Sequence, residues 1–328
     1  MRLSYFPGCL LTGSGGECDL ATRAVARVLG VELVELTDWN CCGGLTGGSV
    51  SADGFAALCR RDLGRMPEGV TELFCACPHC YGNFARALVH GEDAGAYEPV
   101  VLRNVLDVFA DDEVLARLVE KRVEPLTGLE VLAYYGCKLT RPEPEVGRLA
   151  EAGRARRDSG ADSGALERVV EACGAKPVEW SAGGDCCGAA LGVARADVAV
   201  ELMGRIFQAA IEVGAEAIVV ACPLCHLNLD LHQHQVSQRL GRGVDIPVFF
   251  VTELMAVALG IEESEDWLER HLTSPLGMFM RFIEAQEERE YWGEEGPPPE
   301  GEDEAVAVEE AKENVGGRAA NDKEPETV

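Results

Sequence analysis

The chain has 328 residues and a formal net charge of −27 at pH 7. This excess of acidic side chains argues against a nucleic-acid partner, because nucleic acids are bound through basic surfaces. No stretch approaches the roughly 18 consecutive apolar residues that a membrane-spanning helix needs, so we expect any contact with a membrane to go through a partner. Residues 1–9 lack the apolar run of a signal peptide. We therefore expect a cytoplasmic protein in which the cysteines that form motifs, among the 14 of the chain, are metal ligands rather than disulfides.

The first predicted elements alternate between short apolar strands and amphipathic helices. Apolar residues at helical spacing, ended by Gly30, indicate a helix over residues 18–29. Strands are predicted at residues 3–6, 31–36 and 72–75, and further helices at residues 53–65 and 81–89. Residues 100–122 are expected to form two helices joined at Asp111 and Asp112.

The same order of elements returns after residue 128. Strands are predicted at residues 129–135, 176–180, 217–221 and 248–251, and helices at residues 164–172, 197–213 and 253–259. This repeat predicts an α/β fold of two pseudo-symmetric, Rossmann-like βαβ halves with parallel sheets. Ligands of such folds gather beyond the carboxyl ends of the strands.

The sequence divides into five predicted parts. Two cysteine-rich domains cover residues 1–110 and 129–262, joined by a helical connector at residues 111–128. Residues 141–163, inside the second domain, are predicted to be a surface insertion. A helical segment follows at residues 263–292, and its amphipathic stretch 275–291 suits docking on the body of the protein or on a partner. Residues 293–328 contain 12 acidic and three basic residues and few large apolar ones, so we expect a disordered acidic tail.

The cysteines form two copies of one motif, an adjacent pair followed by glycine and then a Cys-x-x-Cys. In both copies 34 residues lie between the pair and the Cys-x-x-Cys, and a further cysteine follows an upstream predicted strand. An adjacent pair reaches one site only if the chain turns there, which the glycines permit. The two sets of five are Cys9, Cys41, Cys42, Cys77 and Cys80 in the first half, and Cys137, Cys186, Cys187, Cys222 and Cys225 in the second.

Such sets of thiolates bind iron–sulfur clusters or structural zinc. Tetrahedral zinc has four positions and leaves one cysteine of each five without a role, whereas a polynuclear cluster can use bridging thiolates. The spacing therefore favours iron–sulfur clusters, with zinc in one half as the alternative. The cysteines outside the motifs, which are Cys18, Cys59, Cys75 and Cys173, are expected in the core.

Three other residues adjoin the predicted ligands. His79 and His226 can donate a proton to a thiolate released at the site, although each suits a packing role at a helix start equally well. Lys138, next to Cys137, can attract an anionic substrate. No Gly-x-Gly-x-x-Gly follows a predicted strand, so this chain is expected to bind neither flavin nor nicotinamide.

The motifs of both halves carry a family resemblance. Tyr-Phe-Pro-Gly-Cys, Cys-Cys-Gly-Gly and Cys-Pro-His-Cys in the first half, with Tyr-Tyr-Gly-Cys, Cys-Cys-Gly-Ala and Cys-Pro-Leu-Cys in the second, resemble the tandem cysteine-rich CCG domains of the heterodisulfide reductase B subunit. The resemblance covers about residues 1–275. It implies that each set of five cysteines holds one noncubane four-iron four-sulfur cluster, and that the two clusters face a shared cavity.

The resemblance also implies a reaction and partners. A small-molecule disulfide, such as that of coenzymes M and B, is cleaved with one electron from each cluster. The iron–sulfur C subunit and the flavin-containing A subunit of the same complex deliver the electrons. Related proteins occur in methanogens, with a role in methanogenesis, and in sulfate reducers and sulfur oxidisers, so the substrate stays open.

Two other functions stay open as well. An electron-transfer subunit of a quinone-linked respiratory dehydrogenase would use similar domains without disulfide chemistry. A non-enzymatic zinc-binding scaffold would contain zinc and no iron. Thioredoxin-like exchange at a Cys-x-x-Cys is disfavoured, because it leaves the adjacent pairs unexplained. We therefore predict an oxidoreductase, the disulfide-cleaving subunit of a heterodisulfide-reductase-type complex.

Overall fold

The computed structural model describes the chain except residues 46, 91–96, 98, 124–125, 157–162 and 293–328. Residues Met1–Phe282 form one compact unit, and the remaining described residues, from Ile283 on, belong to a separate unit. The predicted acidic tail lies outside the described residues. The boundaries of the five predicted parts remain a prediction.

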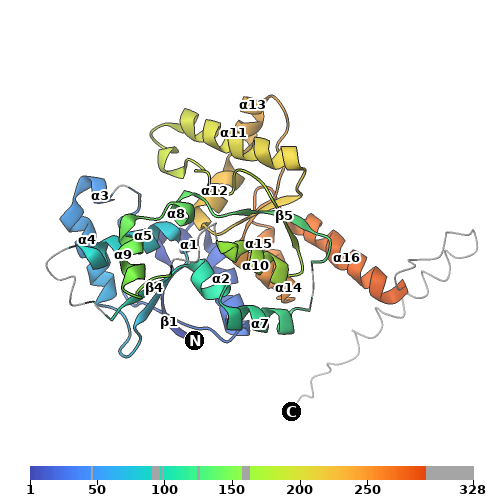
Figure 1. Cartoon of the computed structure of the whole chain (residues 1–328). Helices are drawn as coiled ribbons and strands as arrows, with labels where there is room; N and C mark the ends of the chain where they lie inside the picture. The colour runs from blue at the N-terminus through green and yellow to red at the C-terminus, as the bar shows by residue number, and fades with distance from the viewer. Residues whose placement is uncertain (46, 91–96, 98, 124–125, 157–162, 293–328) are drawn as a thin grey trace, which may run out of the picture. The chain divides into compact units, whose positions relative to one another are not determined.

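The first unit contains two parallel sheets of four strands each, with the same topology (Figure 1). Their strand orders are β2-β1-β3-β4 and β6-β5-β7-β8. The strands are β1 (Arg2–Phe6), β2 (Glu32–Glu35), β3 (Glu72–Cys75), β4 (Val101–Arg103), β5 (Glu130–Tyr134), β6 (Lys176–Val178), β7 (Ala217–Val220) and β8 (Val248–Phe250). The central strands are buried along almost their whole length, as expected for parallel strands covered on both faces. The predicted α/β fold with two repeated halves is confirmed.

The helices follow the strands in the alternating order that the sequence predicts. Up to residue 121 they are α1 (Gly8–Leu11), α2 (Gly16–Val28), α3 (Gly47–Val50), α4 (Ala52–Leu63), α5 (Pro78–Val89), α6 (Val105–Phe109) and α7 (Asp112–Lys121). Beyond it they are α8 (Cys137–Thr140), α9 (Pro144–Glu151), α10 (Ala165–Ala172), the 3₁₀ turn η3 (Ala189–Leu191), α11 (Ala196–Val213), α12 (Pro223–Leu231), α13 (Gln233–Leu240), α14 (Val251–Ala258), α15 (Ser264–Leu268) and α16 (Leu276–Trp292).

Local chemistry fixes where the two helices after the Cys-x-x-Cys strands begin. Cys77 precedes α5 and Cys222 precedes α12, both in extended conformation. Each is followed by a proline in the first helical turn, where a missing N–H costs nothing because that N–H has no partner inside the helix. Each Cys-x-x-Cys therefore lies across a strand–helix junction, with its second cysteine in the first turn of the helix.

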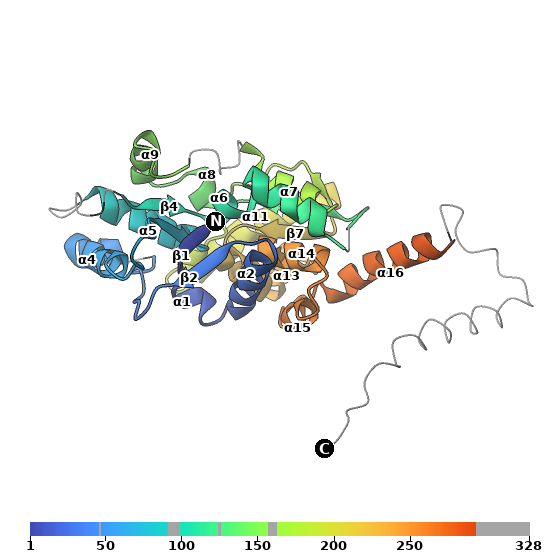
Figure 2. The same ribbon diagram turned by 90° about the horizontal axis from the view of Figure 1, so that it is seen from below.

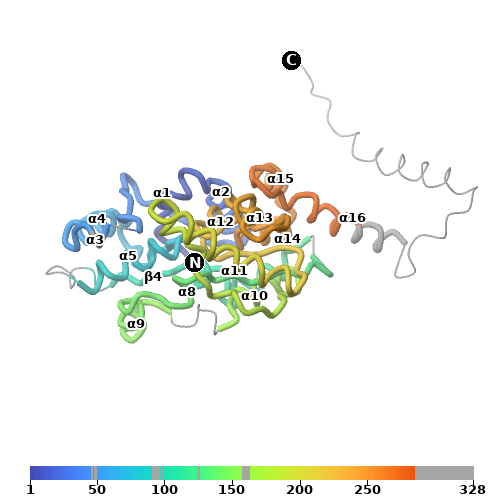
Figure 3. Tube along the Cα trace, turned by 90° about the horizontal axis from the view of Figure 1, so that it is seen from above, coloured from blue at the N-terminus to red at the C-terminus, as the bar shows by residue number. Residues whose placement is uncertain are grey.

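Helix α2 of the first half packs against α14 and α15, which follow the second sheet (Figure 2). The hydroxyl groups of Thr22 and Thr252 lie 3.2 Å apart within this buried contact. In the other direction, the predicted insertion contributes α9, which packs on α5 of the first half (Figure 3). Arg154, just after α9, donates a hydrogen bond to the Val100 carbonyl (3.0 Å). Helices of each half thus pack against the other half. The insertion contains a packed helix, α9, where we predicted no element.

Two further features differ from the expected elements. Residues 100–122 begin with strand β4 before the two predicted helices, because Asn104 caps α6 and leaves only three residues to pair with β3. The start of the amphipathic stretch packs on this chain, since the rings of Phe279 and Phe249 lie 5.1 Å apart. None of the helices in the described part of the chain is both long and apolar enough to span a membrane.

Candidate metal centres

All ten motif cysteines lie just beyond the carboxyl ends of strands. In the first half Cys9 follows β1, the adjacent pair follows β2, and Cys77 follows β3. In the second half the corresponding cysteines follow β5, β6 and β7. Because carboxyl ends of parallel strands meet at one edge of a sheet, each half brings five thiols from three loops to one place.

The first set is connected by short contacts between sulfur atoms. The Sγ atoms of Cys41 and Cys9 lie 3.6 Å apart, and those of Cys42 and Cys80 lie 3.2 Å apart. Cys80 also hydrogen-bonds to Cys77. The adjacent pair turns toward this group because Gly43 and Gly44 follow it with φ of +93° and +60°, values that favour glycine.

The second set repeats this arrangement. The Sγ atoms of Cys187 and Cys225 lie 3.4 Å apart. Cys137 hydrogen-bonds to Cys186, and Cys222 hydrogen-bonds to Cys225. The backbone N–H of Gly188, with φ of +78°, donates to the Cys186 sulfur (3.4 Å).

In each half, the glycine just before the first motif cysteine lies close to the sulfur of the last one. A Cβ on Gly8 would lie 3.2 Å from the Cys80 sulfur, and a Cβ on Gly136 would lie 3.0 Å from the Cys225 sulfur. Both glycines have positive φ, +75° and +70°. The backbone of each glycine therefore lies directly against a thiol. Because glycine has no side chain, the space beside the sulfur stays open for a bound group.

The close thiols hold protons unequally. A hydrogen bond from Cys41, with a further one from Cys80, lowers the pKa of Cys42 to about 3, and the pKa of Cys41 is raised in return. In the second set a hydrogen bond from Cys137 lowers the pKa of Cys186 to about 6. A hydrogen bond from Cys225 lowers the pKa of Cys187. Thiolate is the form that binds metal, so three of the four cysteines in the adjacent pairs favour the ligating form.

A cavity of about 90 Å³ lies against the second set. All five cysteines of that set line it, together with Tyr135, Gly136, Lys138, Ala189 and Ala190. His79, which stands between two cysteines of the first set, closes it from the other half. None of the first-set cysteines is among the described residues that line it. The cavity thus touches both halves, but its sulfur wall belongs to one.

The other predicted site residues are placed differently around this cavity. Burial, with the charge of Lys138, lowers the pKa of His79 to about 4, so the ring at the cavity wall is neutral at pH 7. Lys138 lines the cavity while its ammonium group is paired with Glu143. His226 is 2% exposed and faces Cys18 (3.7 Å) and His271 (3.4 Å), behind the cysteine set rather than in the cavity.

The donor sets fit iron–sulfur clusters on their chemistry. Each consists of five sulfur atoms with no carboxylate among them, on loops whose glycines leave room beside the sulfurs. The four cysteines outside the motifs are fully buried, as predicted for core residues.

Comparison with known sequences matches this geometry to a family. The family described as the CCG cysteine-rich domain matches residues 3–85 and 131–230, that is, both halves. The chain belongs to the CCG family. The resemblance seen in the cysteine motifs is thereby confirmed.

Two relatives of this CCG chain are similar along most of their length. It is 28% identical to the 8-methylmenaquinol:fumarate reductase membrane anchor subunit of Wolinella succinogenes, over 80% of this chain and 94% of the relative. It is 26% identical to the B subunit of the ferredoxin:CoB-CoM heterodisulfide reductase of Methanosarcina mazei, over 86% of this chain and 97% of the relative.

One solved structure has a similar fold. The crystal structure of a hypothetical protein from Helicobacter pylori superposes with a TM-score of 0.59 at 13% sequence identity. The match covers 83% of this chain but 52% of that protein, so the CCG chain spans about half its length. This likeness concerns the fold alone.

Two asparagines belong to the site in addition to the residues predicted from the sequence. Asn83 Nδ2 donates to the Cys42 sulfur (3.3 Å) and to the Gly44 carbonyl (2.9 Å). Asn228 Nδ2 donates to the Cys187 carbonyl (2.7 Å). Each asparagine stands three residues after the last cysteine of its half, so the repeated pattern Cys-x-x-Cys-x-x-Asn was the signal that identifies them. They tie each Cys-x-x-Cys helix to the loop of the adjacent pair.

Proposed function

We propose that this chain is the disulfide-cleaving subunit of a heterodisulfide-reductase-type oxidoreductase complex. The observation that carries the proposal is the gathering of ten thiols into two sets of five at corresponding edges of two sheets. Similarity to the M. mazei B subunit over most of both chains supports it.

In this proposal each half holds one noncubane four-iron four-sulfur cluster. The first is held by Cys9, Cys41, Cys42, Cys77 and Cys80, and the second by Cys137, Cys186, Cys187, Cys222 and Cys225. Such a cluster supplies single electrons and iron with affinity for sulfur. Zinc in the first half is the alternative, in which case only one half is redox-active.

The reaction consumes two electrons and two protons and converts one disulfide into two thiols. The electrons come from the iron–sulfur C subunit, which the flavin-containing A subunit reduces, and the complex lies in the cytoplasm. The disulfide of coenzyme M and coenzyme B is the first substrate to test, because the M. mazei relative carries both coenzymes in its name.

The chain's own residues bind the substrate and exclude water in this proposal. The cavity beside the second cysteine set admits the disulfide, and Tyr135, Ala189 and Ala190 keep its wall apolar. His79 hydrogen-bonds to the departing sulfur from the opposite wall. Lys138 attracts an anionic group, although its pairing with Glu143 weakens that attraction. His226 supports the second set from behind and is a weaker candidate for the proton donor.

The decisive experiment measures iron, acid-labile sulfide and zinc per chain on protein purified without oxygen. About eight iron with equal sulfide and no zinc supports two clusters. Zinc without iron rejects the enzyme. Reduced protein is then mixed with the coenzyme M–coenzyme B disulfide, and release of two thiols per disulfide tests the reaction itself.

A second function is favoured by one observation, the similarity to the W. succinogenes reductase subunit. In that case the chain transfers electrons in a quinol-linked reductase and cleaves no disulfide. Reduction of the oxidised clusters by a quinol, with no thiol released from the disulfide by the reduced protein, supports this alternative and rejects the first proposal.

A further inference from the structure

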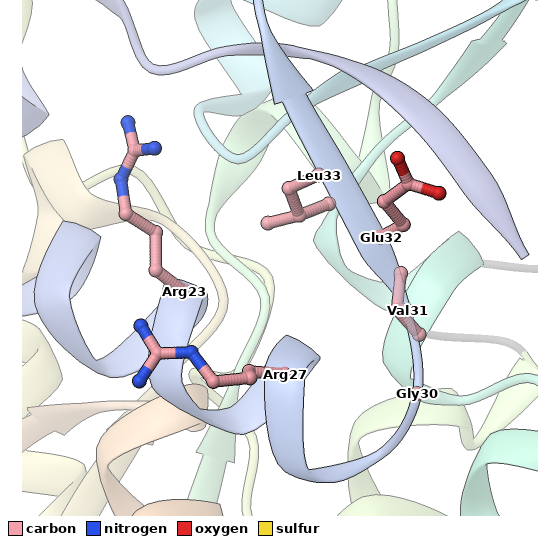
Figure 4. A pocket seen from close by; sticks show the side chains of 6 residues that line it. All are labelled: Arg23, Arg27, Gly30, Val31, Glu32 and Leu33. Atoms are coloured by element: carbon pink, nitrogen blue, oxygen red, sulfur yellow. The ribbon is translucent and has the colours of Figure 1, made fainter.

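Helix α2 borders a surface hollow of about 470 Å³ (Figure 4). The hollow is lined by Arg23, Arg27, Gly30, Val31, Glu32 and Leu33. Arg23 is paired with Asp19 and Glu35 (2.7 Å each), and Glu32 is paired with Arg2 (3.0 Å). These ion pairs neutralise the charges of Arg23 and Glu32, so neither side chain is left to bind a charged ligand.

The first turn of the same helix carries a different group of polar side chains, which meets the second half. Glu17 and Cys18 of this turn lie beside His226, near the start of α12. The Nδ1 atom of His226 is 3.7 Å from the Cys18 sulfur and 3.8 Å from Oε1 of Glu17. The three atoms all lie within 4.8 Å of one another. Cys18 and His226 are buried, whereas the Glu17 side chain is 12% exposed, so the group reaches solvent through Glu17.

Hydrogen bonds within this group do not account for its arrangement. His226 donates a hydrogen bond to the Val248 carbonyl. Because Nδ1 faces Cys18 and Glu17, the donor is Nε2, and Nδ1 keeps its lone pair. A thiol hydrogen bond to Nδ1 then explains the Cys18 contact, but it leaves a Glu17 oxygen facing the same lone pair at 3.8 Å, beyond hydrogen-bonding distance. Sulfur, nitrogen and oxygen atoms that can all donate electron pairs therefore converge on one point.

We propose that Glu17, Cys18 and His226 bind one zinc ion, at a site separate from the two cysteine sets. Zinc lies about 2.3 Å from a thiolate and about 2.0–2.2 Å from nitrogen or oxygen ligands, so neighbouring ligands of tetrahedral zinc are about 3.3–3.6 Å apart. The observed 3.7 and 3.8 Å are close to this spacing. Zinc accepts all three kinds of ligand, whereas a thiolate disfavours magnesium and calcium. A water molecule on the Glu17 side completes the tetrahedron.

The surroundings of the three ligands fit a bound cation. A metal-bound histidine usually donates its other N–H to a carboxylate or a backbone carbonyl, as His226 does here. Burial, with the negative charges of Glu253 and Glu17, raises the pKa of Cys18. The same charges attract a cation to this thiol, and the ion displaces the thiol proton when it binds.

The site also has a structural consequence. Its ligands come from α2 of the first half and α12 of the second, so one ion joins the two halves. His226 directly follows Cys225, the last cysteine of the second set. The zinc therefore holds the Cys-x-x-Cys helix of the second set against the first half.

The test supplies zinc chloride to the full chain purified without oxygen, and measures zinc and iron per chain together with the X-ray absorption spectrum at the zinc edge. About one zinc per chain is expected, bound by one sulfur and otherwise by nitrogen and oxygen. Zinc in a cysteine set shows sulfur ligands alone. Cys18→Ala and Glu17→Gln each weaken zinc binding at least about tenfold in competition with a chelating zinc indicator, and both keep the iron of the parent chain.

Cys173→Ala is the matched control, since Cys173 is equally buried and belongs to neither a cysteine set nor this group. It leaves zinc affinity unchanged. Glu17→Gln changes a side chain that reaches solvent and therefore tests the site without altering the core. A parent chain that takes up no zinc, a spectrum with sulfur ligands alone, or parent affinity in both variants overturns the proposal. Zinc at this site comes in addition to the iron of the cysteine sets, so failure here leaves the cluster proposal untouched.

Discussion

The two cysteine sets have the same ligands, topology and supporting asparagine, yet their surroundings differ. The second set lines a cavity, whereas in the first set Cys9 is exposed at the surface. The repeat places His79 where the second half has Leu224, and Lys138 where the first half has Leu10. Both polar residues line the cavity of the second set. The repeated motif therefore specifies the two sets of thiols, and the two residues that break the repeat both line the cavity beside the second set.

The two halves also differ in the buried residues that lie behind their cysteine sets. Asp107 and Glu253 occupy equivalent positions in the first turns of α6 and α14, and each accepts a hydrogen bond from the backbone N–H that begins its helix (2.8 and 2.7 Å). Only Glu253 is also paired with a histidine, His271, at 2.9 Å and with both side chains buried. This pair lies next to His226, so the second set is supported by a buried charged network.

The largest effect is expected from removing one central thiol of either set. Cys187→Ala and Cys42→Ala should each lose about four of about eight iron atoms, because one ligand of a cluster is missing. Disulfide turnover should fall to background in both, since the proposed reaction draws one electron from each half. The control is Cys173→Ala, a buried cysteine outside the sets. A Cys42→Ala chain with full iron and full turnover would show that the first half holds no cluster.

Breaking the buried pair should cost more than changing its counterpart in the first half. Glu253→Gln leaves His271 buried without its partner and should destabilise the fold by about 3–5 kcal/mol. Asp107→Asn keeps a hydrogen-bonding cap and should cost only about 1 kcal/mol. Thermal unfolding of both variants at one pH measures the difference. Equal costs would mean that the histidine pair contributes nothing.

The pair also predicts how stability depends on pH. Burial alone would raise the pKa of Glu253, but the charge of His271 outweighs it and the pKa is lowered. Burial alone would lower the pKa of His271, but Glu253 outweighs it and the pKa is raised. The stabilisation is therefore complete between the ordinary values of about 4.3 and 6.5. It is lost as pH falls through the lowered pKa of Glu253 or rises through the raised pKa of His271. Melting temperatures across pH should show this dependence in the parent chain and not in Glu253→Gln.

Replacing His79 at the cavity wall with the leucine found at the equivalent position of the second half should slow turnover without loss of metal. His79→Leu copies Leu224 of the second half and removes the hydrogen-bond donor, so kcat should fall about tenfold to a hundredfold. His234→Leu, on exposed α13, is the control. Disulfide kinetics with parallel iron analysis measure the effect. An unchanged kcat in His79→Leu would mean that a residue of the second half, and not His79, donates the hydrogen bond to the departing sulfur.

The smallest effect is expected at Lys138, which the first half replaces with Leu10. Lys138→Ala should raise KM for an anionic disulfide about threefold, because Glu143 already neutralises part of its charge. Glu143→Ala should lower KM for the same reason. Steady-state kinetics at low ionic strength measure both, and a change of KM in the same direction for both variants would contradict an electrostatic role.

Local patterns were sufficient for most of the fold. Nearly every predicted strand and helix appears within two or three residues, because apolar periodicity and glycine ends are short-range signals. Strand β4 was missed because three residues between two helical patterns carry no period of their own. Helix α9 was missed because its apolar positions, Val146 and Leu149, become buried only against α5 of the other half.

By itself, the sequence determined the two sets of five cysteines, their place beyond the strand ends and the family. Ligand motifs are confined to a few residues on one loop, and parallel topology brings such loops to one edge. Only the tertiary structure decided that His79 reaches across to the cavity of the second set, that His226 faces inward, and that Glu17 and Cys18 of the first half lie beside it. These outcomes depend on helices shared between the halves, and contacts between residues far apart in the chain leave no mark on the local pattern of either partner.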